Sequence, residues 1–206
     1  MPLDGSLALV IQILAGISLA ACCGLRAFLP PLVVGLATRF GALDLIFGGA
    51  VPLNEGFEWM ASTPALVTFG VALFVEVLAD KVPVIDHMLD VAQTVVRPLA
   101  GTVVVAASLE EVSPLAATVV GLIVGSTTAG GVHLAKAKVR VVSNMASVGF
   151  AAPFISVLED ITALLGSLIS VFMAALAALF VLALAVFFWM FYRRMKRRQL
   201  PASPSP

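Results

Sequence analysis

The sequence predicts an all-α, polytopic transmembrane helix bundle with about six or seven membrane segments, some of them short, broken or re-entrant. Of the 206 residues, 61% are hydrophobic and 12% are charged, and the mean hydropathy is +1.10. A soluble domain is nearer half apolar and one quarter charged, so this composition indicates an integral membrane protein. The formal net charge is zero, which gives no reason to expect nucleic-acid binding.

The first half of the chain holds three candidate membrane segments. A helix that spans the bilayer needs about 20 apolar residues. Residues 7–24 meet this requirement. Residues 27–40 are also apolar, but the stretch is short and a Pro-Pro pair interrupts it. Residues 64–79 form the third candidate, which carries Glu76 near its end.

The second half of the chain holds four more. Residues 98–108 are too short to span alone, and we expect a re-entrant segment there. Residues 114–132 form a good span, and residues 141–158 a weaker one that a glycine and a proline break. Residues 161–192 are the clearest span. At 1.5 Å per residue such a helix is about 48 Å long, so it must tilt or protrude.

The basic residues are unevenly distributed over the connections between these segments. Residues 41–63 and 108–114 contain carboxylates but no Lys or Arg. The basic residues gather at 81–97, at 136–140 and in the "RRMKRR" stretch at 193–198. By the positive-inside rule, the second group and the C-terminus face the cytoplasm.

We expect a single integral membrane domain over residues 1–198, followed by a disordered tail at 199–206. Short segments interrupted by Gly and Pro occur in both halves, at 24–36 and 145–157. Paired broken helices of this kind point to an inverted-repeat transporter.

Two polar stripes follow helical periodicity. The first lies on a helix predicted between Pro83 and Pro98. Its members are Asp86, Asp90, Gln93 and Arg97. The second comprises His133, Lys136, Arg140, Asn144 and Ser147. Each set occupies one narrow helix face. The stripes either line a wet cavity or belong to interfacial helices whose polar faces meet water.

Ionisable side chains at membrane depth cost about 3 kcal/mol each, so they usually pair or line a hydrated path. We predict that a substrate or ion pathway is lined by Arg26, Glu76, Asp80, Lys81, Asp86, His87, Asp90, Arg97, His133, Lys136, Arg140, Asn144, Glu159 and Asp160. Glu159 and Asp160 are expected between the last two spans. The alternative is that these charges form salt bridges that only clamp helices together.

The motifs of known chemistry are missing. There is no HExxH or CxxC spacing, no GxSxG and no Walker loop. No cofactor is predicted, and a divalent metal has only weak candidate ligands, which are Asp86, His87, Asp90 and His133. A membrane-embedded enzyme acting on a lipid phosphate stays open as an alternative function.

Transport or flipping of a small or phosphate-bearing solute is the leading functional hypothesis. Three side chains are suited to proton coupling: Glu76, Asp80 and His133. Three cations could form a basic cavity for an anion or phosphate: Arg26, Lys136 and Arg140. The expected partners are the lipid bilayer, a small solute or lipid-phosphate substrate, and, in a homo-oligomer, further copies of the chain.

Several segments together resemble a known family. They are "GLRAFLP" (24–30), "ADKVPVIDHMLD" (79–90), "RPLAG" (97–101), "HLAKAKVR" (133–140) and "SVLED" (156–160). The combination resembles an uncharacterised family of small bacterial multi-pass membrane proteins, known as domain of unknown function 4126. The resemblance covers about Gly24 to Asp160. It implies a protein of the bacterial inner membrane, and it implies no activity.

Overall fold

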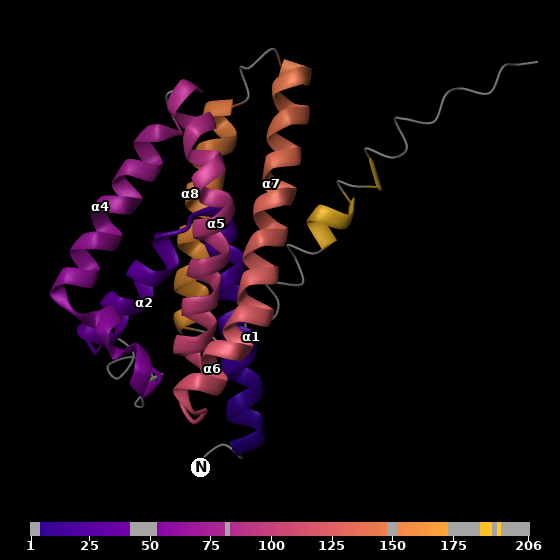
Figure 1. The fold of residues 1–206 in the computed structure, drawn as a ribbon. Coiled ribbons are helices and arrows are strands. Elements are labelled where there is room, and N and C mark those ends of the chain that lie inside the picture. Colours follow the sequence, from indigo (N-terminus) through magenta and orange to yellow (C-terminus); the bar gives the residue numbers. More distant parts are fainter. Residues whose placement is uncertain are drawn as a thin grey trace, which may run out of the picture.

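The all-α class is confirmed by a computed structural model of the chain. The structure describes residues 5–41, 53–80, 83–147, 152–172, 186–190 and 193–194. Every regular element within these ranges is a helix, and the long helices stand side by side as a bundle (Figure 1).

The bundle is built from helices of very different lengths. In chain order they are α1 (Gly5–Leu25), α2 (Leu29–Arg39), the 3₁₀ helix η1 (Glu55–Ala61), α4 (Thr63–Ala79), α5 (Pro83–Ser108), α6 (Pro114–Val120), the π-helical stretch η2 (Gly121–Gly125), α7 (Ser126–Ser147) and α8 (Ala152–Phe172). Because α6, η2 and α7 adjoin without a gap, they form one long helix with a π-helical segment inside it.

Three helical stretches in the described ranges are long and apolar enough to cross a membrane: residues 91–108, 114–143 and 154–171. A fourth arises if η1 and α4, which meet at a bend of 63°, count as one broken span. Large apolar side chains such as Phe74 and Leu122 stand exposed on the outside, as lipid-facing residues would. The chain is therefore a membrane-embedded protein. The expected six or seven segments stay a prediction, since some of them fall outside the described residues.

The prediction of a separate re-entrant segment at 98–108 is wrong, because α5 continues through Pro98 to Ser108. A proline removes one backbone N–H, but packed membrane helices tolerate this loss where neighbours satisfy the freed groups. The Pro98 ring faces Gly130 of α7, whose missing side chain leaves room for it. The first polar stripe therefore lies on a membrane helix.

The predicted span at 141–158 is also wrong, because α7 ends at Ser147 and α8 begins at Ala152. A proline at the second position of α8 suits a helix start, where its missing N–H would be unpaired anyway. Glu159 and Asp160 consequently lie inside α8 and not between two spans. The second stripe shares one continuous helix with residues 114–132.

Helices α1 and α2 form a hairpin. The middle of α1 packs on the C-terminal end of α5, where a Cβ on Gly16 would lie 3.2 Å from Val105 Cα. At the end of α2, Arg39 Nη1 donates to Thr63 Oγ1 at 2.7 Å, at the start of α4. The N–H of Asn54, just before η1, donates to the Ala107 carbonyl, so these elements occupy the same end of the bundle. The chain thus enters and leaves at one end, and residues 26–28 form the tip of the hairpin.

Helix α5 and the long helix formed by α6, η2 and α7 contact each other through glycines, which have no side chain. We call this contact the seam. A Cβ on Gly101 of α5 would lie 2.5 Å from the carbonyl oxygen of Gly125, so the two backbones are in direct contact there. Small residues permit this close approach between membrane helices. The seam sets the register of α5 against α7, and it therefore places the two polar stripes beside each other.

Candidate functional site at the tip of the hairpin

The C-terminal end of α1 is held by two cations. The last carbonyls of a helix have no partner within the helix and carry partial negative charge. Arg97 Nη1 of α5 donates to the Gly24 carbonyl at 2.7 Å, and Lys136 Nζ of α7 donates to the Leu25 carbonyl at 3.1 Å. Arg97 is fully buried and Lys136 is 4% exposed. Two membrane helices therefore supply the cations that close the first arm of the hairpin.

A carboxylate holds the backbone that leads into α2. Glu76 Oε1 accepts the Ala27 N–H at 3.2 Å, and the same oxygen accepts from Gln93 Nε2 at 3.2 Å and from Arg97 Nη2 at 3.3 Å. Arg97 Nη2 also donates to the Gln93 side-chain carbonyl. Glu76 is 1% exposed, and its Oε2 has no hydrogen-bond partner among the described residues. One oxygen of this buried carboxylate thus accepts three hydrogen bonds, and the other accepts none from the described residues.

Arg26, at the tip itself, is fully buried and reaches α8 and the end of α4. Its Nη1 lies 2.6 Å from Asp80 Oδ2, and its Nε lies 2.5 Å from Asp160 Oδ1. Its Nη2 donates to Ser156 Oγ at 3.1 Å. Since Asp80 follows α4 directly and Asp160 lies in α8, this one guanidinium ties the tip to both helices.

The remaining charges connect α7 to α8. Glu159 Oε2 lies 2.9 Å from Lys136 Nζ and 3.3 Å from Arg140 Nη2. The same Arg140 nitrogen lies 3.2 Å from Asp80 Oδ2. The two basic residues of the second stripe therefore face the hairpin and not the lipid.

We call these eight side chains the tip cluster. Its members are Arg26, Glu76, Asp80, Arg97, Lys136, Arg140, Glu159 and Asp160. Four are cations and four are carboxylates, so the cluster is neutral when all are ionised. The expected basic cavity around Arg26, Lys136 and Arg140 is therefore not what the structure shows, because each of these cations has a carboxylate partner.

The other predicted residues divide into two groups. His133 is 5% exposed, and its Nε2 lies 3.4 Å from Thr94 Oγ1, beside the cluster. Lys81 lies outside the described residues, as do the side chains of Asp86, His87, Asp90 and Asn144, whose backbones belong to α5 and α7. Among the side chains that are described, no group of three or more His, Cys, Asp or Glu residues is placed to hold a metal ion.

Two features of the site escaped sequence reasoning. Ser156, which receives Arg26, is a serine in an apolar stretch and carries no distinctive signal. The carbonyls of Gly24 and Leu25 are backbone groups, and side-chain patterns cannot reveal them. The Pro-Pro pair after the "GLR" stretch was the available hint that the helix breaks near Arg26.

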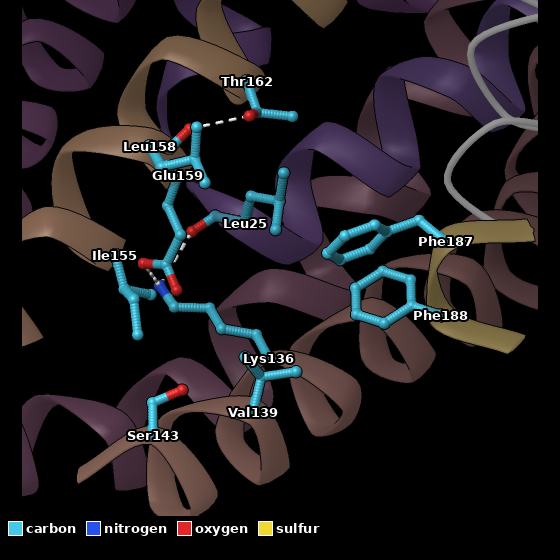
Figure 2. A pocket seen from close by; sticks show the side chains of 10 residues that line it. All are labelled: Leu25, Lys136, Val139, Ser143, Ile155, Leu158, Glu159, Thr162, Phe187 and Phe188. Atoms are coloured by element: carbon cyan, nitrogen blue, oxygen red, sulfur yellow. Dashed lines mark hydrogen bonds and ion pairs between the residues drawn. The ribbon is translucent and has the colours of Figure 1, made fainter. Parts of the chain in front are cut away.

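A pocket adjoins the tip cluster between α7 and α8. Its volume is about 540 Å³, and Figure 2 shows Lys136 and Glu159 on one side and the rings of Phe187 and Phe188 opposite them. The rest of the lining is mainly aliphatic, with Leu25, Val139, Ile155 and Leu158, and Ser143 and Thr162 complete it. The pocket thus combines an apolar wall with one charged pair.

Comparison with known proteins gives one match. A family model with the description "Domain of unknown function (DUF4126)" matches residues 13–194, which is most of the chain. No curated protein and no solved structure matches.

Proposed function

The chain belongs to the DUF4126 family, whose description names no activity, so we propose a function from the geometry of the hairpin tip. We propose that the protein is a transporter that carries a small anionic or phosphate-bearing solute past the tip cluster, coupled to protons. The observation that carries this proposal is a helical hairpin whose tip lies inside the bundle among eight charged side chains that compensate one another. At 1.5 Å per residue, Arg97 lies about 21 Å along α5 from Pro83 and about 16 Å from Ser108.

Broken or re-entrant backbone occurs at membrane depth only where protein surrounds it or where it lines a cavity. Transporter sites use such breaks, because the free ends of the half-helices offer N–H groups to anions and carbonyls to cations. In this protein the carbonyls of α1 hold Arg97 and Lys136, and the N–H of Ala27 holds Glu76. The free backbone groups at the tip are therefore paired with charged side chains of the protein itself.

The neutrality of the cluster suggests why protons should be coupled to the solute. An anion that entered a cluster of four cations and four carboxylates would add an uncompensated charge in a region of low polarity. Such a charge costs about 3 kcal/mol or more at membrane depth. Protonation of one carboxylate restores neutrality, so one solute charge and one proton would travel together.

Glu76 is the carboxylate that we propose takes the proton. Its Oε2 is free to be protonated without breaking a hydrogen bond among the described residues. Loss of its negative charge would weaken the attraction to Arg97, which also holds the Gly24 carbonyl. Protonation would therefore loosen the tip of the hairpin, and this links the proton to a movement of the backbone.

The same proposal fixes the setting of the protein. We place it in the bacterial inner membrane with the C-terminus in the cytoplasm, because the connections at 41–63 and 108–114 contain no Lys or Arg while the "RRMKRR" stretch near the C-terminus holds five. The end of the bundle where α7 gives way to α8 would then face the cytoplasm. The bilayer is the immediate partner, and association of several copies into a homo-oligomer is part of the proposal.

The test is uptake of radiolabelled inorganic phosphate into proteoliposomes that contain the full chain. With an inward proton gradient, we expect uptake above that of protein-free liposomes. Glu76→Gln should abolish gradient-driven uptake but keep phosphate exchange at equal pH, since only the proton step is lost. Lys138→Ala is the matched control, because Lys138 is exposed on α7 and should leave both rates unchanged.

Absence of both phosphate and proton flux in the wild-type protein would overturn the proposal. If Glu76→Gln then lowered the thermal stability, the charges would be helix clamps. A new lipid product in the same liposomes would instead favour the membrane-embedded enzyme.

A further inference from the structure

The pocket between α7 and α8 lies at the edge of the bundle and within its apolar part. The lining residues of α7 and α8 belong to candidate membrane spans, residues 114–143 and 154–171. Leu158 and Phe187, which line it, are 61% and 56% exposed, so the mouth of the pocket is apolar. In a membrane such a mouth opens onto acyl chains, and lipid is the molecule that reaches it.

The charged pair at the inner wall is a built polar site. Lys136 and Glu159 are 4% and 8% exposed, and both belong to the lining. An ammonium group has three N–H donors. Two of the Lys136 donors have acceptors among the described residues, Glu159 Oε2 and the Leu25 carbonyl (Figure 2). One donor therefore remains for a ligand.

Glu159 can share Lys136 with a ligand because it has a second cation. Its Oε2 lies 3.3 Å from Arg140 Nη2 as well as 2.9 Å from Lys136 Nζ. An anionic group beside Lys136 would lengthen the second contact without leaving the buried carboxylate alone. The arrangement therefore tolerates a competing phosphate.

We infer that this pocket is a lateral phospholipid-binding site, in which the lipid phosphate accepts the third N–H of Lys136 and an acyl chain lies against the apolar wall. A pocket of about 540 Å³ with an apolar lining and a few polar groups falls in the range of ligand sites. The inference stands apart from the transport proposal, because it concerns lipid bound from the membrane side. A bound lipid would also be coupled to the hairpin through Lys136, which donates to the Leu25 carbonyl.

The experiment is native mass spectrometry of the delipidated full chain in detergent, titrated with dioleoylphosphatidylglycerol. We expect one tightly bound lipid in the wild-type protein. Lys136→Ala should bind it about 10 to 100 times more weakly, the range for loss of a hydrogen bond to a charged group. Lys138→Ala, two residues away and exposed on the same helix, should bind like the wild type. Glu159→Gln should bind more tightly, because the competing carboxylate charge is gone.

A second variant covers the case in which Lys136→Ala fails to fold. Val139→Trp fills the pocket but leaves the ion pairs in place, and it should also lose the bound lipid. Equal binding of dioleoylglycerol, which lacks the phosphate, would overturn the proposed role of Lys136. Displacement of the lipid by inorganic phosphate alone would show that the pocket binds a free anion, and it would overturn the assignment of a lipid site. Phosphate flux measured in proteoliposomes is a separate readout, so either proposal can fail while the other stands.

Discussion

Substitution of Gly125 by alanine tests the seam that brings the two polar stripes together. A Cβ on Gly125 would lie 2.6 Å from the Gly101 carbonyl carbon and 3.0 Å from the Thr102 nitrogen, and closer still to the Gly101 oxygen. These atoms belong to backbone and cannot rotate away, so α5 and α7 must separate. Overpacking costs up to about 3 kcal/mol, and the better helix propensity of alanine returns about 1 kcal/mol. We expect a net loss of about 2 kcal/mol.

The matched control lies six residues further along the same helix. Gly131 has nothing within 4 Å of an added Cβ, so Gly131→Ala should gain about 1 kcal/mol from helix propensity alone. The two substitutions are chemically identical and should shift the melting temperature in opposite directions, by about 4–8 °C down and 2–4 °C up.

A thiol-reactive fluorogenic maleimide provides the assay, because the free cysteines Cys22 and Cys23 are both fully buried and should react only on unfolding. The reasoning fails if Gly125→Ala melts at or above the wild-type temperature. It also fails if the cysteines react fully in the folded protein.

Two further predictions use the same thermal assay. Arg26→Met should destabilise the protein by about 3 kcal/mol, the lower end of the range for a broken buried ion pair, because buried Asp80 loses one of its two cations and the partly exposed Asp160 loses its contact with Arg26. Adding Asp80→Asn should recover part of this loss, and an undisturbed single variant would show that the pairs contribute little. Asn54→Ala should cost about 3 kcal/mol at about 1 kcal/mol per hydrogen bond, since Asn54 donates to two carbonyls of the 109–112 turn and accepts one N–H. A loss below about 1 kcal/mol would argue against that anchor.

The stripe periodicity predicted which polar residues share a helix face, but it left open whether that face meets water or protein. His133, Lys136 and Arg140 are all buried on one side of α7, and Gln93 and Arg97 are buried on one side of α5. The cost of charge at membrane depth also predicted that these residues would find partners. Both arguments succeed because they depend only on helix geometry and on the polarity of the surroundings.

The helix boundaries were less predictable for a physical reason. In a water-soluble helix, proline and glycine usually mark ends, because water competes for the freed backbone groups. Membrane helices tolerate proline where surrounding protein compensates for the lost hydrogen bond, and Pro98 lies within α5. Pro153 does follow the rule, since it is the second residue of α8, but nothing in the sequence indicated that it began a helix and did not break one.

The sequence could not predict which charges pair, because a periodic pattern shows which residues share a helix face but not which helix packs against that face. Arg26 has no periodic companions, and only the fold shows that its guanidinium contacts both Asp80 and Asp160. The folding of α1 against α2 decides this pairing, and that hairpin depends on contacts of α1 with α5, α7 and α8. Long-range packing therefore supplies the information that local sequence lacks.

Charge compensation in the tip cluster fits both a structural clamp and a transport site. The two functions differ in what they predict for polar groups that have no partner. A cluster whose sole task is to clamp helices gains nothing from a buried carboxylate oxygen without a partner, which costs free energy to desolvate. Glu76 Oε2 has no hydrogen-bond partner within the part of the chain that the structure describes, and the other oxygen of this carboxylate accepts the Ala27 N–H of the hairpin. Lys136, which has acceptors for two of its three N–H groups among the described residues, lines the adjoining pocket. Buried donors and acceptors that have no protein partner at a helix break are expected in a site that binds and releases a ligand. This is the reason to measure solute flux before thermal stability.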